Sequence, residues 1–347
     1  MKISVCLIVK NEEKVLERCL SCVVGFADEI VVVDTGSEDD TKRIARNFTD
    51  KIYDFKWNYD FAEARNYAFS LASYPYAFWI DADDVITKEN VDKILELKRE
   101  RNNADTYMMK YAVAFNDCGE PSFEFYRERL VRNCEYAKFK SFVHEAIIPF
   151  GIVKRCDITI EHRKISSGNP RRNIGLYERH LSAGENLDAR GQYYYAKEFF
   201  YLKEYGSCEH ELTKYLAMSG KFFPNEKDAY ITLSICRKIM KKNDAKEPLF
   251  KALAIAGPDA EIFCRLGDIE TDYKKGTEYY KCALCCEYPD ENGGFLDKKF
   301  YYLEPLLRLV AISYENGDKT NAKFFHDLCV KNYPSSAAVI YNSQFFK

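Results

Sequence analysis

The sequence has no long apolar run and no strong excess of charge of one sign. No stretch reaches the ~18 consecutive apolar residues that a membrane-spanning helix needs, and the formal net charge of the 347-residue chain is only −3. We therefore expect no membrane span and no broad binding to nucleic acid. Met1 leads almost directly into a strand-like segment, without a charged and apolar leader. This start predicts no signal peptide, which agrees with the cytoplasmic location that we expect from the cysteines.

Zinc-ribbon and disulfide spacings are also missing, although the chain has 13 cysteines. That count is odd, and most of the cysteines lie in apolar periodic segments. Two clusters, at 19–22 and 282–286, fall within helical patterns and have no His or Cys partners at zinc-ribbon spacing. Because a free cysteine packs as a small apolar residue, we expect buried free thiols in a reducing compartment.

Strand and helix signals alternate along residues 1 to 165. Apolar runs predict strands over 2–10, 29–36, 51–55 and 76–84, and the segments between them show helical spacing over 11–23, 37–48 and 61–72. Ser37, followed by Asp40, resembles a capping pattern for the second of these helices. The alternation predicts an α/β domain with a doubly wound, mostly parallel sheet, whose ligands bind at the carboxyl ends of its strands.

Polar side chains gather at three of those strand ends. They are Asn11, Glu12 and Glu13 after the first strand, Asp34, Thr35 and Gly36 after the second, and Asp81, Asp83 and Asp84 after the fourth. Because the ends of parallel strands meet at one edge of a sheet, we expect these residues to lie close together. The sequence therefore places the functional site at this edge.

The last of these clusters contains a D-x-D arrangement, Asp81-Ala82-Asp83. Crowded carboxylates at the end of a buried strand cost free energy unless a cation or hydrogen-bond donors compensate. Two carboxylates with this spacing suit Mg²⁺ or Mn²⁺, which usually take one or two protein carboxylates together with phosphate oxygens and water. The same residues could also form a solvated acidic turn before the next helix, so the motif alone leaves both interpretations open.

The pattern of secondary-structure signals changes at about residue 171, where strand signals end and paired helical segments begin. Pro258, Pro289 and Pro334 punctuate these helices at spacings of 31 and 45 residues, and the second spacing contains an irregular 11-residue insert, 290–300. Removing the insert leaves 34 residues, the period of tetratricopeptide repeats. We therefore predict an α/β domain over residues 1–168 and an all-α helical-repeat domain over 169–347.

Five stretches of the first half resemble the family 2 glycosyltransferases, whose catalytic domain has the GT-A fold. The stretches are VCLIVKNEEKVLERCL, IVVVDTGSEDDTKRIA, WNYDFAEARNYAF, FWIDADD and RERLVRNCEYAKFKSFVHEAI. Together they cover about the first 165 residues in the family's order. With the helical tail, the chain is also similar to the bacterial peptide-modifying members that glycosylate bacteriocin precursors on cysteine or serine. There is no Q-x-x-R-W, which disfavours a processive enzyme.

The resemblance implies roles for individual residues. It implies a nucleotide-sugar pocket, for a donor that is expected to be uridine-linked, formed by Val9, Asn11, Glu12, Asp34, Asp60, Arg65, Asn66 and Asp81. It implies that Asp83, with Asp81, binds the Mn²⁺ or Mg²⁺ that bridges the donor's two phosphates. His162 matches a late histidine near that metal, although a lone histidine is usually structural. Arg65 could instead form a structural ion pair with Asp60.

The acceptor needs a group that takes a proton from its nucleophile. His144 and Glu145 supply candidates near the end of the first half, and a carboxylate suits an inverting displacement. We predict Glu145 as the base, with Asp84 as the alternative and His144 orienting the substrate. Arg171 and Arg172 could reach the diphosphate or could simply begin a solvated helix.

The leading hypothesis is a metal-dependent, inverting glycosyltransferase that moves a sugar to a peptide, protein or glycan acceptor. We expect the helical tail to hold the acceptor or to form a homodimer, because stacked helical repeats build concave surfaces. One alternative is a non-catalytic sugar-nucleotide-binding scaffold with a protein-interaction tail. Another is a nucleotidyltransferase, but its basic, glycine-rich loop is replaced here by the acidic VKNEEK.

Overall fold

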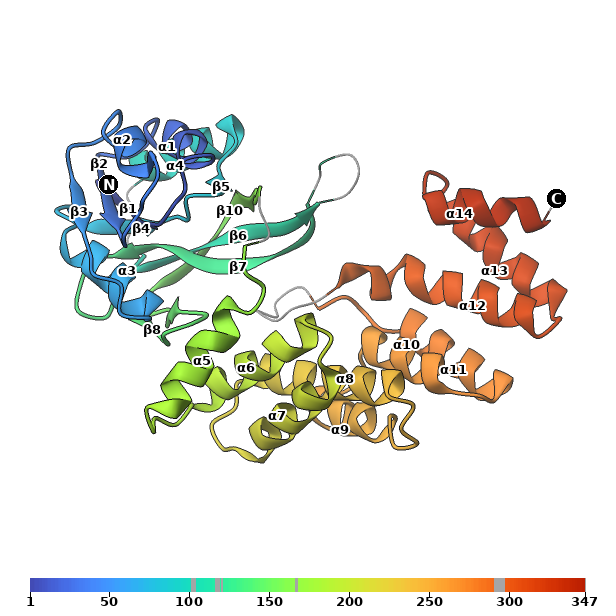
Figure 1. The fold of residues 1–347 in the computed structure, drawn as a ribbon. Coiled ribbons are helices and arrows are strands. Elements are labelled where there is room, and N and C mark those ends of the chain that lie inside the picture. Colours follow the sequence, from blue (N-terminus) through green and yellow to red (C-terminus); the bar gives the residue numbers. More distant parts are fainter. Residues whose placement is uncertain (101–103, 116–118, 120, 166–167, 290–296, 347) are drawn as a thin grey trace. The chain divides into compact units, whose positions relative to one another are not determined.

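The structure is a computed structural model that describes residues 1–347 except 101–103, 116–118, 120, 166–167, 290–296 and 347 (Figure 1). The chain divides into two units, Met1–Glu185 and Asn186–Lys347. The division predicted from sequence fell at 168/169, so the first unit also takes in helix α5 (Arg172–Ser182). In the part of the chain that is described, no helix is long and apolar enough to cross a membrane.

The first unit alternates strands and helices as predicted. Its first elements are β1 (Ile3–Val9), α1 (Leu16–Val23), β2 (Glu29–Asp34), α2 (Thr41–Ala45), β3 (Ile52–Asp54), α3 (Phe61–Ser70), β4 (Tyr76–Trp79), β5 (Asp84–Val85) and α4 (Lys88–Arg99). Five more strands follow before α5: β6 (Thr106–Phe115), β7 (Pro121–Arg132), β8 (Phe139–Lys140), β9 (Ala146–Ile147) and β10 (Val153–His162). The predicted positions of the first four strands and three helices are confirmed.

Eight of these strands form one mixed sheet in the order β3-β2-β1-β4-β7-β6-β10-β5. Strands β1 to β4 pair in parallel, as expected of a doubly wound half, and β10 runs parallel to β6. The long strand β7 is antiparallel to both β4 and β6, and the short β5 is antiparallel to β10. The carboxyl ends of β1, β2 and β4 therefore meet at one edge, while β10 brings its own end to β5.

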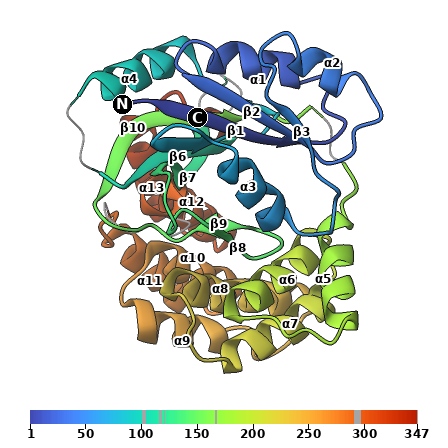
Figure 2. The same ribbon diagram turned by 90° about the vertical axis from the view of Figure 1, so that its left-hand side faces the viewer.

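Both faces of the sheet are covered, which explains why its strands are continuous apolar runs. Helices α1, α2 and α4 cover one face, and α3 lies on the other with the small β8–β9 pair (Figure 2). Alternate residues of β1 enter the two cores: Ile3, Val5 and Leu7 face the α1 side, and Cys6 faces α3. This layering leaves the strand ends free to carry polar residues.

The capping prediction for α2 is wrong. The helix begins at Thr41, and neither Ser37 nor Asp40 caps it through a side-chain hydrogen bond. The Ser37 hydroxyl instead accepts a hydrogen bond from the backbone N–H of Asn11, 2.9 Å away. Instead of capping the helix, Ser37 connects the β2–α2 loop to the residues that follow β1, at the edge of the sheet where the site lies.

The second unit consists of helical hairpins, as predicted. Its helices are α6 (Ala189–Tyr201), α7 (Tyr205–Ala217), α8 (Phe223–Ile239), α9 (Glu247–Ala256), α10 (Ala260–Ile269), α11 (Tyr273–Leu284), α12 (Leu303–Glu315), α13 (Lys319–Asn332) and α14 (Ala337–Asn342), with short 3₁₀ turns at Lys298–Tyr301 and Ser343–Phe346. Helices pack in consecutive pairs, α6 with α7, α8 with α9, α10 with α11 and α12 with α13. The part of the predicted insert at 290–296 lies outside the described residues.

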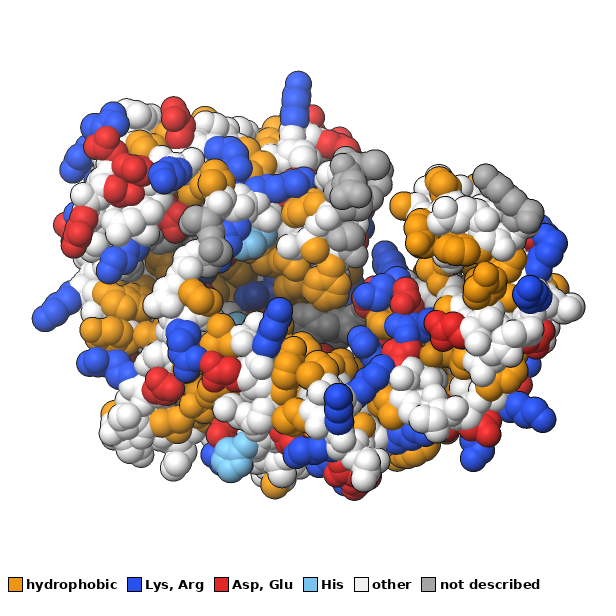
Figure 3. Space-filling model, turned by 45° about the vertical axis from the view of Figure 1, so that its right-hand side comes forward, with side chains coloured by type: hydrophobic (Ala, Val, Ile, Leu, Met, Phe, Trp, Pro, Cys, Tyr) orange, Lys and Arg blue, Asp and Glu red, His pale blue; other side chains and the backbone are white. Residues whose placement is uncertain are grey.

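Four cysteines of the second unit are buried, as predicted, whereas Cys282 and Cys285 of the second predicted cluster are exposed. Cys208, Cys236, Cys264 and Cys329 are buried free thiols. Apolar side chains nevertheless gather on the surface near the C-terminal end of this unit (Figure 3), where α13 and α14 expose Phe324, Val330, Ile340 and Tyr341.

Candidate functional site

A cleft of about 1580 Å³ opens at the carboxyl ends of β1 and β4. It is larger than the ~300–1,000 Å³ of an ordinary small-ligand pocket, so it can hold two substrates. Most of the predicted site residues line it: Val9, Asn11, Glu12, Arg65, Asp81, Asp83, His144, Glu145 and His162. Asp34, Asp60, Asn66 and Asp84 are not among the residues that form its wall.

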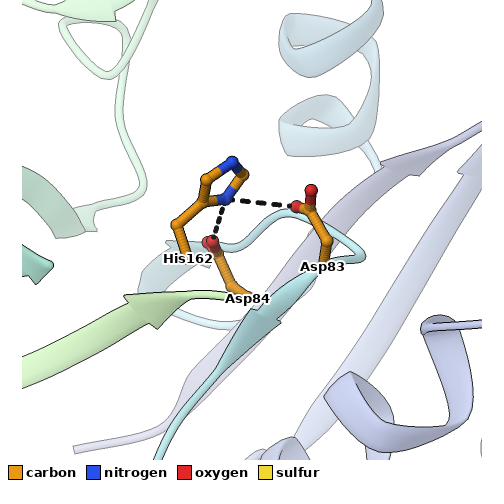
Figure 4. Close-up of side chains that lie close together, drawn as sticks. All are labelled: Asp83, Asp84 and His162. Atoms are coloured by element: carbon orange, nitrogen blue, oxygen red, sulfur yellow. Dashed lines mark hydrogen bonds and ion pairs between the residues drawn. The ribbon is translucent and has the colours of Figure 1, made fainter. Parts of the chain in front are cut away.

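Strand pairing builds the acidic corner of the cleft. The chain turns after β4, and the short β5 then pairs antiparallel with the end of β10, so that Asp84 lies opposite His162. The imidazole Nδ1 of His162 lies 3.2 Å from Asp84 Oδ1 and 3.4 Å from Asp83 Oδ1 (Figure 4). Residues 78 positions apart in sequence therefore meet because two strand ends share one ladder.

Asp84 is the buried support of this corner. Its side chain has no exposed surface, and it accepts hydrogen bonds from the Tyr111 hydroxyl at 3.0 Å, Arg129 Nη1 at 3.0 Å and the backbone N–H of Asp81 at 3.1 Å. Arg129 is itself fully buried and stacks between Trp79 and Tyr111, 3.8 and 4.1 Å from the two ring centroids. These contacts favour a positioning role for Asp84 over the catalytic role considered from sequence.

Arg65 joins two of the predicted site carboxylates. Its guanidinium donates from Nη2 to Asp81 at 2.5 Å and from Nε to Glu145 at 2.6 Å. Burial alone would raise the pKa of Asp81, but Arg65 and Arg129 outweigh it and hold that pKa well below its usual range. Asp81 is thus compensated by arginine within the protein. The Arg65–Asp60 pair considered from sequence does not form, since Asp60 instead caps α3 through the N–H of Glu63.

Asp83 and Glu12 are compensated less well, since the charge of Arg172 only partly opposes the upward shift in the pKa of Glu12. Burial, together with the charges of Asp81 and Asp84, raises the pKa of Asp83, against the opposing effect of His162. Burial and the charges of Asp83 and Asp81 raise the pKa of Glu12 to about 7. The cleft therefore presents carboxylates whose charge is costly in the ligand-free protein. A bound cation would relieve that cost.

The side chains of this corner fit a divalent cation. One donor atom from each of Asp83, Asp84 and His162 lies within 4.8 Å of the others, the grouping drawn in Figure 4. Two carboxylates and an imidazole form a mixed oxygen and nitrogen set, which suits Mn²⁺ better than the all-oxygen preference of Mg²⁺. Sequence placed Asp81 beside Asp83 and His162 in the metal set. In the structure the third member of the metal set is Asp84, whereas Asp81 forms an ion pair with Arg65.

Three predicted nucleotide contacts hold loops in place. Asp34 is fully buried, and its Oδ1 accepts from the N–H groups of Gly36 and Ser37 at 2.9 Å each. Asn66 forms two hydrogen bonds with the backbone of Phe139, joining α3 to β8. With Asp60 at the start of α3, these residues shape the surroundings of the cleft. Sequence position predicted their neighbourhood but not the direction of their side chains.

Other residues of the cleft wall were not predicted. Trp79 and Tyr111 line it, as does Arg127, whose Nη2 donates to the backbone carbonyl of Glu145 at 3.1 Å. Arg65, Arg127 and Arg129 all lie within 5 Å of the Trp79 ring centroid. The arginine-rich start of RERLVRNC was a signal for this arrangement, because β7 pairs with β4 and carries Arg127 and Arg129 toward Trp79.

Comparison with known proteins finds relatives of the part of the chain that contains the cleft. The Glycosyl transferase family 2 model matches residues 4–143, which contain β1 to β8 and the acidic corner up to Asp84. Over these residues the first unit is therefore similar to the family 2 glycosyltransferases. The mixed sheet with its parallel first half is the predicted GT-A arrangement, and that fold prediction is confirmed together with the helical domain that follows it.

Two curated relatives resemble different extents of the chain. The SPbeta prophage-derived glycosyltransferase SunS of Bacillus subtilis is 27% identical over 296 residues, which cover 80% of this chain and 65% of that protein. A TPR repeat-containing protein of Synechococcus elongatus is 30% identical over 146 residues, 42% of this chain and 35% of that one. The chain thus spans less than two thirds of the length of either relative. The crystal structure of S. aureus TarS 1-349 superposes with a TM-score of 0.41 at 15% identity, covering 94% of this chain and 90% of that one.

Proposed function

We propose that the protein is a metal-dependent, inverting glycosyltransferase that uses a nucleotide-sugar donor, with uridine diphosphate as the leaving group. The proposal rests on two features that occur in one cleft. One is the acidic corner, whose negative charge is not fully balanced within the protein, and the other is a carboxylate that an arginine holds in place. Asp83 and His162 belong to the corner, and Glu145 is the held carboxylate. The chemistry of sugar transfer needs both.

The corner serves the donor. Asp83 and His162, supported by Asp84, would hold Mn²⁺ or Mg²⁺, and such an ion supplies charge stabilisation to the leaving diphosphate as a Lewis acid. Asn11 and Glu12 lie beside the corner and border the space for the nucleotide. Arg65 holds the carboxylate of Asp81, and this bond keeps the turn after β4 in one conformation. The fixed carboxylates therefore need little rearrangement when the donor binds.

Glu145 serves the acceptor. It lines the cleft, keeps 13% of its side chain exposed, and is fixed by Arg65 Nε at 2.6 Å. A carboxylate in this position can accept the proton of the acceptor nucleophile while the bond between the sugar and the diphosphate breaks. Asp84 has no exposed surface from which to do so. His144, which precedes the base on the cleft wall, is placed to orient the acceptor.

The proposal is tested by a thermal-shift panel of nucleotide sugars on the full chain, with and without Mn²⁺. A ligand at about 100 times its Kd stabilises the folded state by ~2.7 kcal/mol, so one donor with Mn²⁺ should raise the melting temperature clearly above the others. The same donor should then be hydrolysed slowly, with water as acceptor. Metal-dependent binding without any hydrolysis or transfer would favour the scaffold alternative. No response to any nucleotide sugar would overturn the proposal.

A further inference from the structure

A second wall of the cleft is aromatic and basic. The loop before α3 contributes Trp57 and Tyr59, the first residue of α3 is Phe61, and α5 contributes Arg172 and Arg179. We call these five residues the aromatic–arginine wall. Trp57 packs against both neighbours, with ring centroids 4.8 Å from Phe61 and 6.3 Å from Tyr59. The three rings therefore form one continuous surface inside the cleft.

The two arginines lie over aromatic rings, and the Nε of Arg172 also donates to Asn173 Oδ1 at 3.2 Å. The Arg179 guanidinium lies 3.8 Å from the Tyr59 ring centroid, and that of Arg172 lies 5.1 Å from Phe61. Within the described residues, neither arginine forms an ion pair with a carboxylate. A stacked guanidinium is fixed in plane while its edge stays open to a planar anion. Tyr59 lines the cleft with 43% of its surface exposed, and it adopts a left-handed backbone conformation with φ of 71°, a strained state for a residue with a large side chain.

The wall shares its support with the proposed base. The backbone N–H of Phe61 donates to the carbonyl of Phe142 at 3.0 Å, and the Phe142 ring stacks on His180 of α5 with centroids 4.2 Å apart. Phe142 begins the short loop that continues to His144 and Glu145. A molecule that lies along the wall therefore enters the cleft beside the residue proposed to take the acceptor's proton.

The spacing of the arginines indicates what kind of acceptor fits. Arg172 and Arg179 are seven residues apart on α5, so they project from the same side of the helix at an axial separation of ~10.5 Å. In a polyproline II-type chain, residues three apart lie on the same side at ~9 Å. Arginine forks bind carboxylates through two parallel hydrogen bonds, and the three rings between them offer an apolar surface to the intervening residues.

We propose that the aromatic–arginine wall is the acceptor subsite and that it binds an extended, acidic peptide segment with carboxylates about three residues apart. This inference rests on the proposed glycosyltransferase function and names the chemical class of its acceptor. Arg172 and Arg179 select the acceptor by charge, and the rings hold its backbone in an extended conformation near Glu145.

The test measures peptide binding alone, without donor and in the presence of a chelator. The probe is a fluorescein-labelled peptide of repeating Glu-Ala-Ala units, followed by fluorescence polarisation on the full chain at low ionic strength. Arg172→Gln and Arg179→Gln should each weaken binding at least about tenfold, a loss typical of one charge-assisted hydrogen bond. Arg179→Lys should restore only part of it, because lysine keeps the charge but not the planar fork.

The matched control is Arg46→Gln at the end of α2, an exposed arginine outside the cleft wall. It should leave peptide binding unchanged, and a peptide of Lys-Ala-Ala units should not bind. Equal loss in the control would show nonspecific attraction and overturn the subsite. Inorganic polyphosphate that binds through the two arginines, with no binding of the acidic peptide, would contradict a peptide acceptor. Either failure would leave the donor chemistry untouched, because the assay needs neither metal nor nucleotide sugar.

Discussion

Two regions of the molecule bury charge, and they balance it differently. In the second unit, Lys197 on α6 and Asp228 on α8 form an ion pair of 2.8 Å, to which Tyr193 and Thr232 add hydrogen bonds. In the first unit, the acidic corner crowds Asp83 against two other carboxylates with only the imidazole of His162 opposed to it. The helical pair is satisfied internally, and the corner is not.

The direction of the pKa shifts expresses this difference. Burial alone would raise the pKa of Asp228, but Lys197 and the hydroxyl groups around it lower that pKa overall. The pKa of Asp83 is raised. Ionisation of Asp228 therefore stabilises the fold, and ionisation of Asp83 destabilises it. A protein that keeps a costly carboxylate facing a cleft is expected to use it on a ligand.

The largest effect on stability should come from breaking the helical pair. Lys197→Met keeps the volume of the side chain but leaves Asp228 without its cation. We expect a loss of about 3 kcal/mol, the lower end for a buried pair, since 26% of the Asp228 side chain is exposed. Hydrogen exchange in α6 and α8 would report it. The double variant Lys197→Met/Asp228→Leu should regain most of the loss, and failure to do so would show that packing, not charge, is responsible.

Asp83→Asn should reduce sugar transfer but increase the stability of the metal-free protein. Sugar transfer should fall about 100-fold or more, because the metal's contribution to the leaving group is worth several kcal/mol. Stability without metal should rise by up to about 1 kcal/mol, since the substitution removes like-charge repulsion. Activity assays and thermal melting in chelator measure the two effects. A variant that is both inactive and less stable would argue that Asp83 is structural.

The two carboxylates should also differ in pH dependence. For Asp228 the folded pKa is lowered, so its stabilisation is present above the unfolded value of ~3.9 and is lost as the pH falls through the folded pKa. For Asp83 the folded pKa is raised, so its cost is absent below ~3.9 and appears as the pH rises through the folded pKa. Asp228→Asn should thus be less stable, and Asp83→Asn more stable, than the wild type at pH 7. Both differences should shrink toward pH 3, and a difference that persists in acid would contradict the assignment.

The smallest predicted effect concerns the support beneath the corner. Tyr111→Phe removes one of the hydrogen bonds to Asp84 and leaves those from Arg129 and from the backbone of Asp81. We expect a stability loss of about 1 kcal/mol and a modest weakening of metal binding, because the Tyr111 hydroxyl helps to orient the Asp84 carboxylate. Mn²⁺ titration would measure it. A complete loss of metal binding would mean that Tyr111 acts directly at the site.

The sequence predicted elements well and side-chain directions poorly. Strand runs and helical hairpins are local patterns of burial, so β1 to β4 and the paired helices of the second unit could be located before the structure was known. The edge where Asn11, Asp81 and Asp83 meet followed from the parallel topology.

Pairings over long sequence distances could not be predicted in this way. Asp84 is buried because β5 pairs with β10 and because Arg129 of β7 and Tyr111 of β6 contact its carboxylate. The local sequence does not distinguish it from Asp83, the preceding residue, which lines the cleft. Asp60 could have been recognised as a helix cap, since it precedes FAEARNYAF with Glu63 three residues later. Asp34 is buried because the loop after β2 turns its backbone N–H groups toward the Asp34 carboxylate, and the sequence does not show this turn.

Whether the acidic corner holds the donor through a metal ion can be measured by calorimetric titration of uridine diphosphate into the full chain. The titration is run with Mn²⁺ and with chelator, for the wild type and for Asp83→Asn. We expect strong binding only by the wild type with Mn²⁺, and a loss of at least tenfold in affinity when either the metal or the Asp83 carboxylate is removed. Equal affinity in all four titrations would contradict this expectation, because the acidic corner would then have no part in holding the donor.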